Sequence, residues 1–81
     1  MPVSDYIRSA RAKEDDDLAG CSRSALLDAL TLPPRDPARW AAYEEWIVCA
    51  AELRRRGRGD LIDQARAAAR AEAFPPRRAG R

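Results

Sequence analysis

Residues 36–57 read "DPARWAAYEEWIVCAAELRRRG", and this stretch decides the fold because it predicts one long helix. The side chain of Asp36 can accept a hydrogen bond from the free backbone N–H groups of a first helical turn, and Pro37 suits the first helical position. From there we expect the helix to run for about five turns, at about 3.6 residues per turn, to Gly57.

The apolar side chains of this helix cover a wide part of its surface. At about 100° per residue they fall within a continuous arc of roughly 200°. Such an arc predicts that neighbours contact the helix from more than one side, so we place residues 37–56 as the central helix of the fold. The arc contains Trp40, Tyr43, Trp46, Ile47, Cys49, Ala50, Ala51 and Leu53, whereas Glu44, Glu45, Glu52, Arg55 and Arg56 lie on the remaining surface.

A further helix is expected at about residues 61–73, with Asp60 as its N-cap and a Pro-Pro pair beyond its end. Its inner face is mostly alanine, which allows two helix axes to approach toward the short end of the usual range of about 8–10 Å. We expect this face to pack against the central helix, with Arg66 and Arg70 turned outward.

Two weaker helical patterns precede the central helix. Residues 22–32 have alanine and leucine on one side, and residues 4–13 carry a fainter apolar stripe. The acidic run "EDDD" at residues 14–17 is either a solvated loop or the start of a helix, and Gly20 favours a break. No segment alternates like a strand. The sequence therefore predicts an all-α bundle of three to four helices.

A chain of 81 residues forms one domain at most and is near the lower size limit for independent folding. We expect this domain at residues 1–74, followed by a Pro- and Arg-rich tail at residues 75–81. Many of the apolar residues are alanine, so the core is thin and leaves little room for a catalytic cleft. A domain of this kind often needs a partner or a second copy.

The net charge is only +2, but the charges are distributed unevenly along the chain. Residues 1–53 hold six basic and ten acidic side chains, whereas residues 54–81 hold nine basic and three acidic ones. Because an electric field acts locally, the basic C-terminal part predicts an acidic partner or head-to-tail association of copies. Lys13 is the single lysine, and the high arginine and alanine content suggests a GC-rich bacterial or phage genome.

No apolar run approaches the roughly 18 residues of a membrane-spanning helix, and no signal-peptide pattern opens the chain. The expected location is therefore the cytoplasm of a bacterium or of a phage-infected cell, with a virion as the alternative. The two cysteines are too few and too far apart in the sequence for a disulfide framework or a closed zinc site.

The residue types argue against catalysis. The chain has no histidine, which removes the commonest general base and the Ser-His and Cys-His nucleophile arrangements. Residues 14–17 lack the ligand spacing of a calcium loop, and "GRG" at residues 57–59 lacks the spacing of a phosphate-binding loop. Cys49 falls on the apolar arc and is expected in the core. We therefore expect no enzyme activity, no cofactor and no metal site.

The stretch "ELRRRGRGDLID" at residues 52–63 has a structural interpretation. Basic residues favour a helix C-terminus and acidic residues an N-terminus, so one helix can end here and another can begin. Glu52 can also pair with Arg56 one turn further along the helix. The tripeptide Arg58-Gly59-Asp60 matches the integrin-binding motif, but three residues carry little information, and Asp60 serves better as a cap.

The same stretch also permits a DNA- or RNA-binding interpretation. Helix 37–56, turn 57–60 and helix 61–73 would form a helix-turn-helix-like unit whose arginines contact phosphates. Asp60 and Asp63 oppose this interpretation, because they lie at the start of the recognition helix, where the phosphate potential is most negative.

The aromatic cluster of the central helix favours a protein interface. Its members are mostly expected in the core, but Trp40 or Trp46 is expected to stay partly exposed, and exposed Trp and Arg are typical interface anchors. We therefore expect a non-enzymatic adaptor, stoichiometric inhibitor or assembly subunit, of phage or mobile-element type, that binds an acidic protein partner. A nucleic-acid regulator and a virion component are the alternatives. The expected contact residues are Trp40, Trp46, Arg54, Arg55, Arg56, Arg58, Arg66 and Arg70, with Arg77, Arg78 and Arg81 in the tail.

Overall fold

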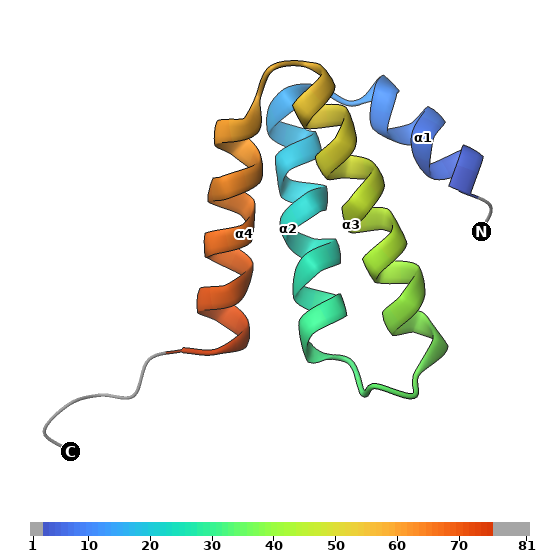
Figure 1. Cartoon of the computed structure of the whole chain (residues 1–81), viewed down its shortest axis with the longest axis vertical. Coiled ribbons are helices and arrows are strands. Elements are labelled where there is room, and N and C mark those ends of the chain that lie inside the picture. Colours follow the sequence, from blue (N-terminus) through green and yellow to red (C-terminus); the bar gives the residue numbers. More distant parts are fainter. Residues whose placement is uncertain (1–2, 76–81) are drawn as a thin grey trace, which may run out of the picture.

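The computed structural model describes residues 3–75, and this part of the chain contains four helices and no strand (Figure 1). The predicted small all-α bundle is thereby confirmed. The helices are α1 (Val3–Ala12), α2 (Asp15–Thr31), α3 (Pro37–Arg55) and α4 (Gly59–Ala73). The predicted tail falls, apart from Pro75, outside the described residues.

α2 lies between α3 and α4, and α1 packs on α3 (Figure 1). α3 contacts each of the other three helices, as expected of the central helix. The alanine-faced α4, however, packs mainly on α2 and touches α3 much less. α3 and α4 are therefore held together mainly by their packing on α2. The sequence predicted only a short helix at this position.

α2 is longer than predicted because it begins in the acidic run and continues through Gly20. Asp15–Asp17 occupy its first turn, where the helix dipole stabilises carboxylates. Leu18 and Ser22 are fully buried on its inner side, and the Ser22 hydroxyl donates to the carbonyl oxygen of Leu18 at 2.8 Å. This burial outweighs the cost of about 1 kcal/mol for a glycine in a helix interior. The predicted break at Gly20 is wrong for this reason.

The first turn of α3 forms as predicted. Asp36 Oδ1 accepts a hydrogen bond from the N–H of Ala38 at 2.9 Å, and a proline holds the first helical position. α4 starts differently, at Gly59, with Arg58 in the capping position. Asp60, the predicted N-cap, lies inside the first turn, where its carboxylate accepts two hydrogen bonds from Arg58 at 3.0 and 3.1 Å.

α3 ends at Arg55, and Gly57 just beyond its C-cap has a φ of +75°, in the left-handed region that favours glycine. The N–H of Gly57 donates to the carbonyl oxygen of Arg54 at 3.0 Å, and the N–H of Arg58 donates to that of Leu53 at 2.8 Å. These two bonds form a Schellman motif. The chain turns back after it, so that α4 runs antiparallel to α3 (Figure 1).

The buried core is small and leaves large side chains of α3 outside. Leu18, Leu53 and Ala69 are fully buried, and α4 contributes alanines over most of its contact with α2. The apolar arc of α3 is only partly covered, because Tyr43 is 46% exposed and Ile47 is 52% exposed. The interior therefore does not contain all the aromatic residues that the sequence assigned to it.

Candidate functional site

The arginine-rich end of α3 contains an ion-pair network within the chain. Glu52, predicted on the polar side of the helix, is instead buried, because arginine side chains cover it. Its carboxylate accepts hydrogen bonds from Arg55 at 2.6 and 3.0 Å and from Arg56 at 2.8 Å, which confirms the predicted pairing with Arg56. These bonds, first those from Arg55, hold the pKa of Glu52 at about 2, below its ordinary value of 4.5.

Two of these arginines also connect different helices. Arg56 donates to the carboxylate of Asp15 at 2.9 Å and to the carbonyl oxygens of Ala10 and Arg11 at 3.1 and 3.3 Å. Arg58 donates to the other carboxylate oxygen of Asp15 at 2.9 Å. The hydrogen bond from Arg56 is the main reason that the pKa of Asp15 lies below its ordinary value. The acidic start of α2 and the arginine-rich turn therefore compensate each other's charge.

The unit formed by α3, the turn and α4 differs from a helix-turn-helix motif. The two helices of that motif cross at about 90–120°, whereas α3 and α4 run antiparallel (Figure 1). They also contact each other little, because each packs mainly on α2. The unit is an antiparallel helical hairpin whose arms are held apart by α2.

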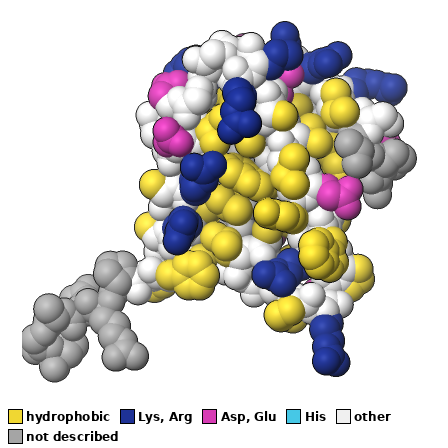
Figure 2. All heavy atoms as spheres, in the orientation of Figure 1, with side chains coloured by type: hydrophobic (Ala, Val, Ile, Leu, Met, Phe, Trp, Pro, Cys, Tyr) yellow, Lys and Arg dark blue, Asp and Glu magenta, His cyan; other side chains and the backbone are white. Residues whose placement is uncertain are grey.

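A groove opens between α3 and α4, above α2. It consists of two adjoining hollows of about 360 and 350 Å³ that share Leu26, Leu30 and Tyr43. Figure 2 shows apolar side chains gathered in the middle of this face, with basic side chains at its margins. We call it the aromatic groove: α2 supplies Leu26, Ala29 and Leu30, α3 supplies Arg39, Trp40, Tyr43 and Trp46, and α4 supplies Arg66, Arg70 and Phe74.

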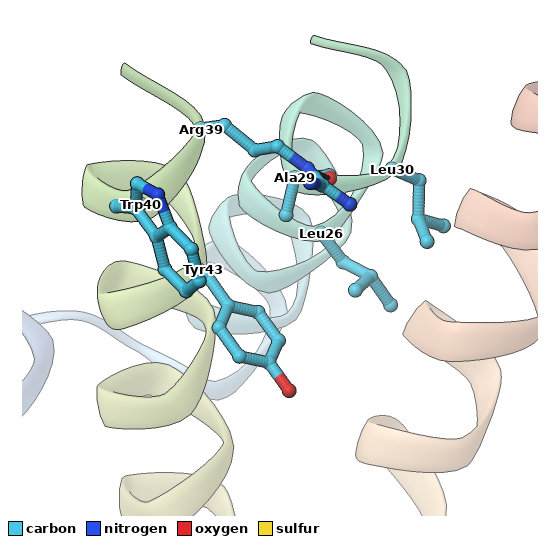
Figure 3. Close-up of a pocket in the computed structure, with 6 residues that line it drawn as sticks. All are labelled: Leu26, Ala29, Leu30, Arg39, Trp40 and Tyr43. Atoms are coloured by element: carbon cyan, nitrogen blue, oxygen red, sulfur yellow. Dashed lines mark hydrogen bonds between the residues drawn. The ribbon is translucent and has the colours of Figure 1, made fainter. Parts of the chain in front are cut away.

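Large aromatic side chains face water at this groove. Trp40 is 61% exposed and Phe74 is 62% exposed. Figure 3 shows Trp40 and Tyr43 projecting from α3, near Leu26 and Leu30 of α2, with the Tyr43 hydroxyl at the outer end of its side chain. Several apolar side chains exposed together on a concave surface are typical of protein interaction sites.

Trp46 lies deeper than Trp40. It is 8% exposed and belongs to the core. The guanidinium carbon of Arg66 lies 5.8 Å from the centre of its ring, within the range of a cation–π interaction. Arg66 also lies 3.5 Å from a carboxylate oxygen of Asp63. Trp46 therefore forms part of the wall of the groove, and Trp40 is the tryptophan available for contact.

Two further arginines border the aromatic groove. Arg39 Nε donates to the carbonyl oxygen of Ala29 at 2.9 Å, which fixes this guanidinium at the C-terminal end of α2 (Figure 3). Arg70 is exposed and has no ion-pair partner among residues 3–75. Unlike Arg55, Arg56 and Arg58 at the end of α3, Arg70 can pair with a ligand without breaking an ion pair within the described chain.

The predicted contact residues fall into two separate regions. Four of them lie at the aromatic groove, and the other four lie at or just beyond the opposite end of α3, where Arg54 is about 20 Å from Trp40 at a rise of about 1.5 Å per residue. The first set is Trp40, Trp46, Arg66 and Arg70; the second is Arg54, Arg55, Arg56 and Arg58; the predicted tail residues Arg77, Arg78 and Arg81 lie outside the described part of the chain.

Arg39, Tyr43 and Phe74 line the groove but were not among the contact residues predicted from the sequence. Phe74, the C-cap of α4, follows Arg66 and Arg70 at a constant spacing of four and lines the same hollow, and this spacing was present in the sequence. The position of Arg39 depends on a carbonyl oxygen of another helix and has no local signal.

Other kinds of site find little support within residues 3–75. No group of three potential ligand side chains there could hold a metal ion, and no helix there is long and apolar enough to cross a membrane. Cys49 is buried as predicted, and burial raises the pKa of its thiol to about 11, so that it is uncharged at neutral pH. Comparison with protein-family models, curated proteins and solved structures gives no match for this chain.

Proposed function

We propose that this protein is a small non-enzymatic interaction module that binds an acidic protein partner at the aromatic groove. The observation that carries the proposal is the meeting of exposed aromatic side chains and arginines on one concave surface. Tryptophan, tyrosine and arginine are the residues most enriched among the energetic centres of protein interfaces. Acting by stoichiometric contact, the module would serve as an adaptor, an inhibitor or an assembly subunit.

The proposal assigns binding to the arginines of the groove and not to those at the end of α3. Arg56 and Arg58 already pair with Asp15, and Arg55 already pairs with Glu52. A partner at that end would have to break these bonds before it gained its own. Arg70 carries no such cost, since no carboxylate among the described residues pairs with it.

The DNA- or RNA-binding alternative has no specific support in this geometry. A recognition helix must present its first residues to the bases, and here that position holds Asp60, which is paired with Arg58. The antiparallel hairpin would also have to open. Binding of nucleic acid is therefore tested below as the alternative to binding of a protein partner.

Affinity capture from nuclease-treated lysate of the native host tests the proposal. The bait is used as the parent protein, as the double variant Arg66→Glu/Arg70→Glu, and as the control Arg54→Glu, which changes an exposed arginine far from the groove. We expect one protein to be retained in stoichiometric amount by the parent and by the control, and to be lost with the double variant. Equal retention by all three baits would contradict the assignment to the groove.

Titration against arbitrary duplex DNA distinguishes nucleic-acid binding from the proposed binding of a protein partner. Affinity for duplex DNA depends strongly on salt when phosphate contacts dominate. We expect no measurable binding at about 50 mM salt, where screening is weak. A steep salt dependence that Arg55→Ala or Arg66→Ala reduces would instead support nucleic-acid binding.

A further inference from the structure

Resting on the proposed function, we infer that the segment bound in the aromatic groove is a short, acidic, amphipathic helix of the partner. This helix lies between α3 and α4 and packs on α2, so that it forms a four-helix bundle with α2, α3 and α4. The inference concerns the conformation and charge pattern of the ligand, which the proposed function leaves open. Shape, backbone chemistry and charge each support it.

The shape of the groove suits a helix. α3 and α4 both pack on α2 but hardly on each other, so a channel with two helical walls runs above α2. Leu26 and Leu30 form its floor. Along α4 it extends from Arg66 to Phe74, which is about 12 Å at a rise of about 1.5 Å per residue. A bound helix of about two to three turns would match this length.

The backbone chemistry of the groove argues against an extended ligand. Residues 3–75 contain no strand, so no sheet edge offers hydrogen bonds to an extended peptide. Over an apolar floor, the N–H and C=O groups of such a peptide would stay unpaired, which costs free energy. A helix satisfies these groups internally and presents one apolar side to the floor.

The charge of the groove selects an acidic helix. Arg66 and Arg70 line one wall, and Arg39 lies near the N-terminal end of the other. Carboxylates beside the apolar stripe of a bound helix would face these guanidinium groups, and arginine pairs with carboxylates through two parallel hydrogen bonds. Arg66 and Arg70 are four residues apart, which matches carboxylates one turn apart on the ligand.

The C-terminal tail and α1 do not supply a suitable occupant. Residues 76–81 contribute three arginines and no acidic residue, so their charge has the same sign as the wall. α1 carries two arginines and one aspartate, and Asp15 at the start of α2 is paired with Arg56 and Arg58. α3 carries Glu44 near the exposed Trp40, but Trp40 already lines the groove of its own copy. We therefore place a foreign partner in the groove, and the sedimentation experiment below tests a second copy.

Designed peptides test the inference on the intact protein. The probe is a fluorescein-labelled peptide of about 14 residues, or about four turns, with leucine and phenylalanine at i, i+3 or i+4 and i+7 and glutamate elsewhere. One control peptide has the same composition in scrambled order, and another has two central prolines. Binding is measured by fluorescence anisotropy, and helix formation in the complex by circular dichroism.

We expect the amphipathic peptide to bind and to become helical, and both control peptides to bind at least about tenfold more weakly. Arg66→Glu/Arg70→Glu should weaken binding by about tenfold or more, since it places like charges together. Arg54→Glu should change the affinity less than about twofold. Binding should also shift the tryptophan emission to shorter wavelength, and Trp40→Phe should remove this shift, because Trp40 is the exposed tryptophan.

Other outcomes overturn the inference in distinguishable ways. If a scrambled or proline-containing peptide binds equally well and the Arg66→Glu/Arg70→Glu variant loses it, the acidic-partner site stands but the helical ligand is wrong. If no peptide binds while capture of the protein partner still depends on the groove, the helical ligand is again wrong. If sedimentation equilibrium shows a dimer that Trp40→Ala dissociates, a second copy occupies the groove and the inference fails.

Discussion

Glu52 is a buried carboxylate whose charge is balanced by two arginines on its own helix. Arg55 and Arg56 reach it from one turn further along α3, and they hold its pKa at about 2. Arg56 then continues to Asp15 and to the last carbonyl groups of α1. Single side chains at this end therefore stabilise the fold, whereas Arg70 at the aromatic groove has no ion-pair partner among residues 3–75 and remains available to a ligand.

Glu52→Gln should lower the free energy of unfolding by about 1–2 kcal/mol at neutral pH, because the hydrogen bonds lose their charge. The folded-state pKa lies below the ordinary value of 4.5, so the stabilisation is complete above about pH 4.5 and is lost as the pH falls toward about 2. Urea denaturation of parent and variant across this range measures the difference.

The control for this experiment is Glu44→Gln, an exposed glutamate on the same helix, which should change stability by less than about 0.5 kcal/mol. The parent and Glu52→Gln should become equally stable near the low end of the pH range. A difference between them that stays constant down to that end would contradict the role given to the Glu52 charge.

Truncation of the two tryptophans should change the free energy of unfolding by very different amounts. Trp46→Ala should cost about 3 kcal/mol or more, because it empties a buried site. A domain of this length has a total stability of only about 4–12 kcal/mol. Trp40→Ala should cost less than about 0.5 kcal/mol while removing ligand binding. Thermal unfolding of the two variants checks this, and equal destabilisation by both would contradict the assignment of Trp40 to the surface.

Hydrogen bonds and ion pairs of single side chains were predictable where the two bonded residues lie close together in the sequence. The cap at Asp36 and the pairing of Glu52 with Arg56 are contacts over two and four residues, and both are confirmed. The exposure of Tyr43 depends on how far α4 lies from α3, and the position of Arg39 depends on a carbonyl oxygen of α2, so neither was predictable from nearby residues. The burial of Glu52 was missed because periodicity does not register coverage by long arginine side chains.

At the scale of elements, the three glycines within or between helices have different backbone roles. Gly57 has a left-handed backbone, whereas Gly20 and Gly59 lie within α2 and α4. A Cβ atom added at any of these three positions meets nothing within 4 Å. Substitution at these sites therefore reports backbone conformation alone.

We expect three different results from alanine at these glycines. Gly57→Ala should destabilise by about 1–2 kcal/mol, the cost of a left-handed conformation for an L-residue. Gly20→Ala should stabilise by about 0.5–1 kcal/mol, because alanine is favoured in a helix interior. Gly59→Ala should be neutral or slightly stabilising. Chemical denaturation of the three variants measures this order, and a destabilising Gly20→Ala would contradict the continuous α2.

α1 is held to the rest of the fold largely at its C-terminal end. Arg56→Ala removes the hydrogen bonds to Ala10 and Arg11 and the ion pair to Asp15. We expect the amides of α1 to exchange with solvent about fivefold faster or more, since local opening becomes easier. Arg54→Ala, an exposed neighbour, is the control. Unchanged exchange in α1 of the Arg56→Ala variant would contradict this attachment.

The number and type of helices could be predicted from capping residues and apolar periodicity, but their neighbours could not. The prediction made α3 the central helix, and α3 does contact every other helix. Periodicity does not predict against which of two helices an alanine face packs. α4 packs on α2, where Ala65 and Ala69 are buried. The length of α2 was not predictable in the same way, because a glycine favours a break and the burial of Leu18 and Ser22 that offsets it has no local signal.

At the scale of the whole molecule, the aromatic groove follows from this arrangement of helices. Because α4 packs on α2 and not fully on α3, the apolar side of α3 near its start has no cover. Leu26 and Leu30 of α2 then form a floor between the two walls. A domain with so small a core gains stability when a partner covers such a surface.

Two-dimensional ¹H–¹⁵N NMR of the intact protein, titrated with the acidic amphipathic peptide, tests the central claim most directly. The account predicts that the indole N–H signal of Trp40 and the backbone amides of Leu30, Tyr43 and Arg70 shift, while those of residues 54–58 stay in place. Shifts that gather at residues 54–58, with the Trp40 indole signal unchanged, would contradict it.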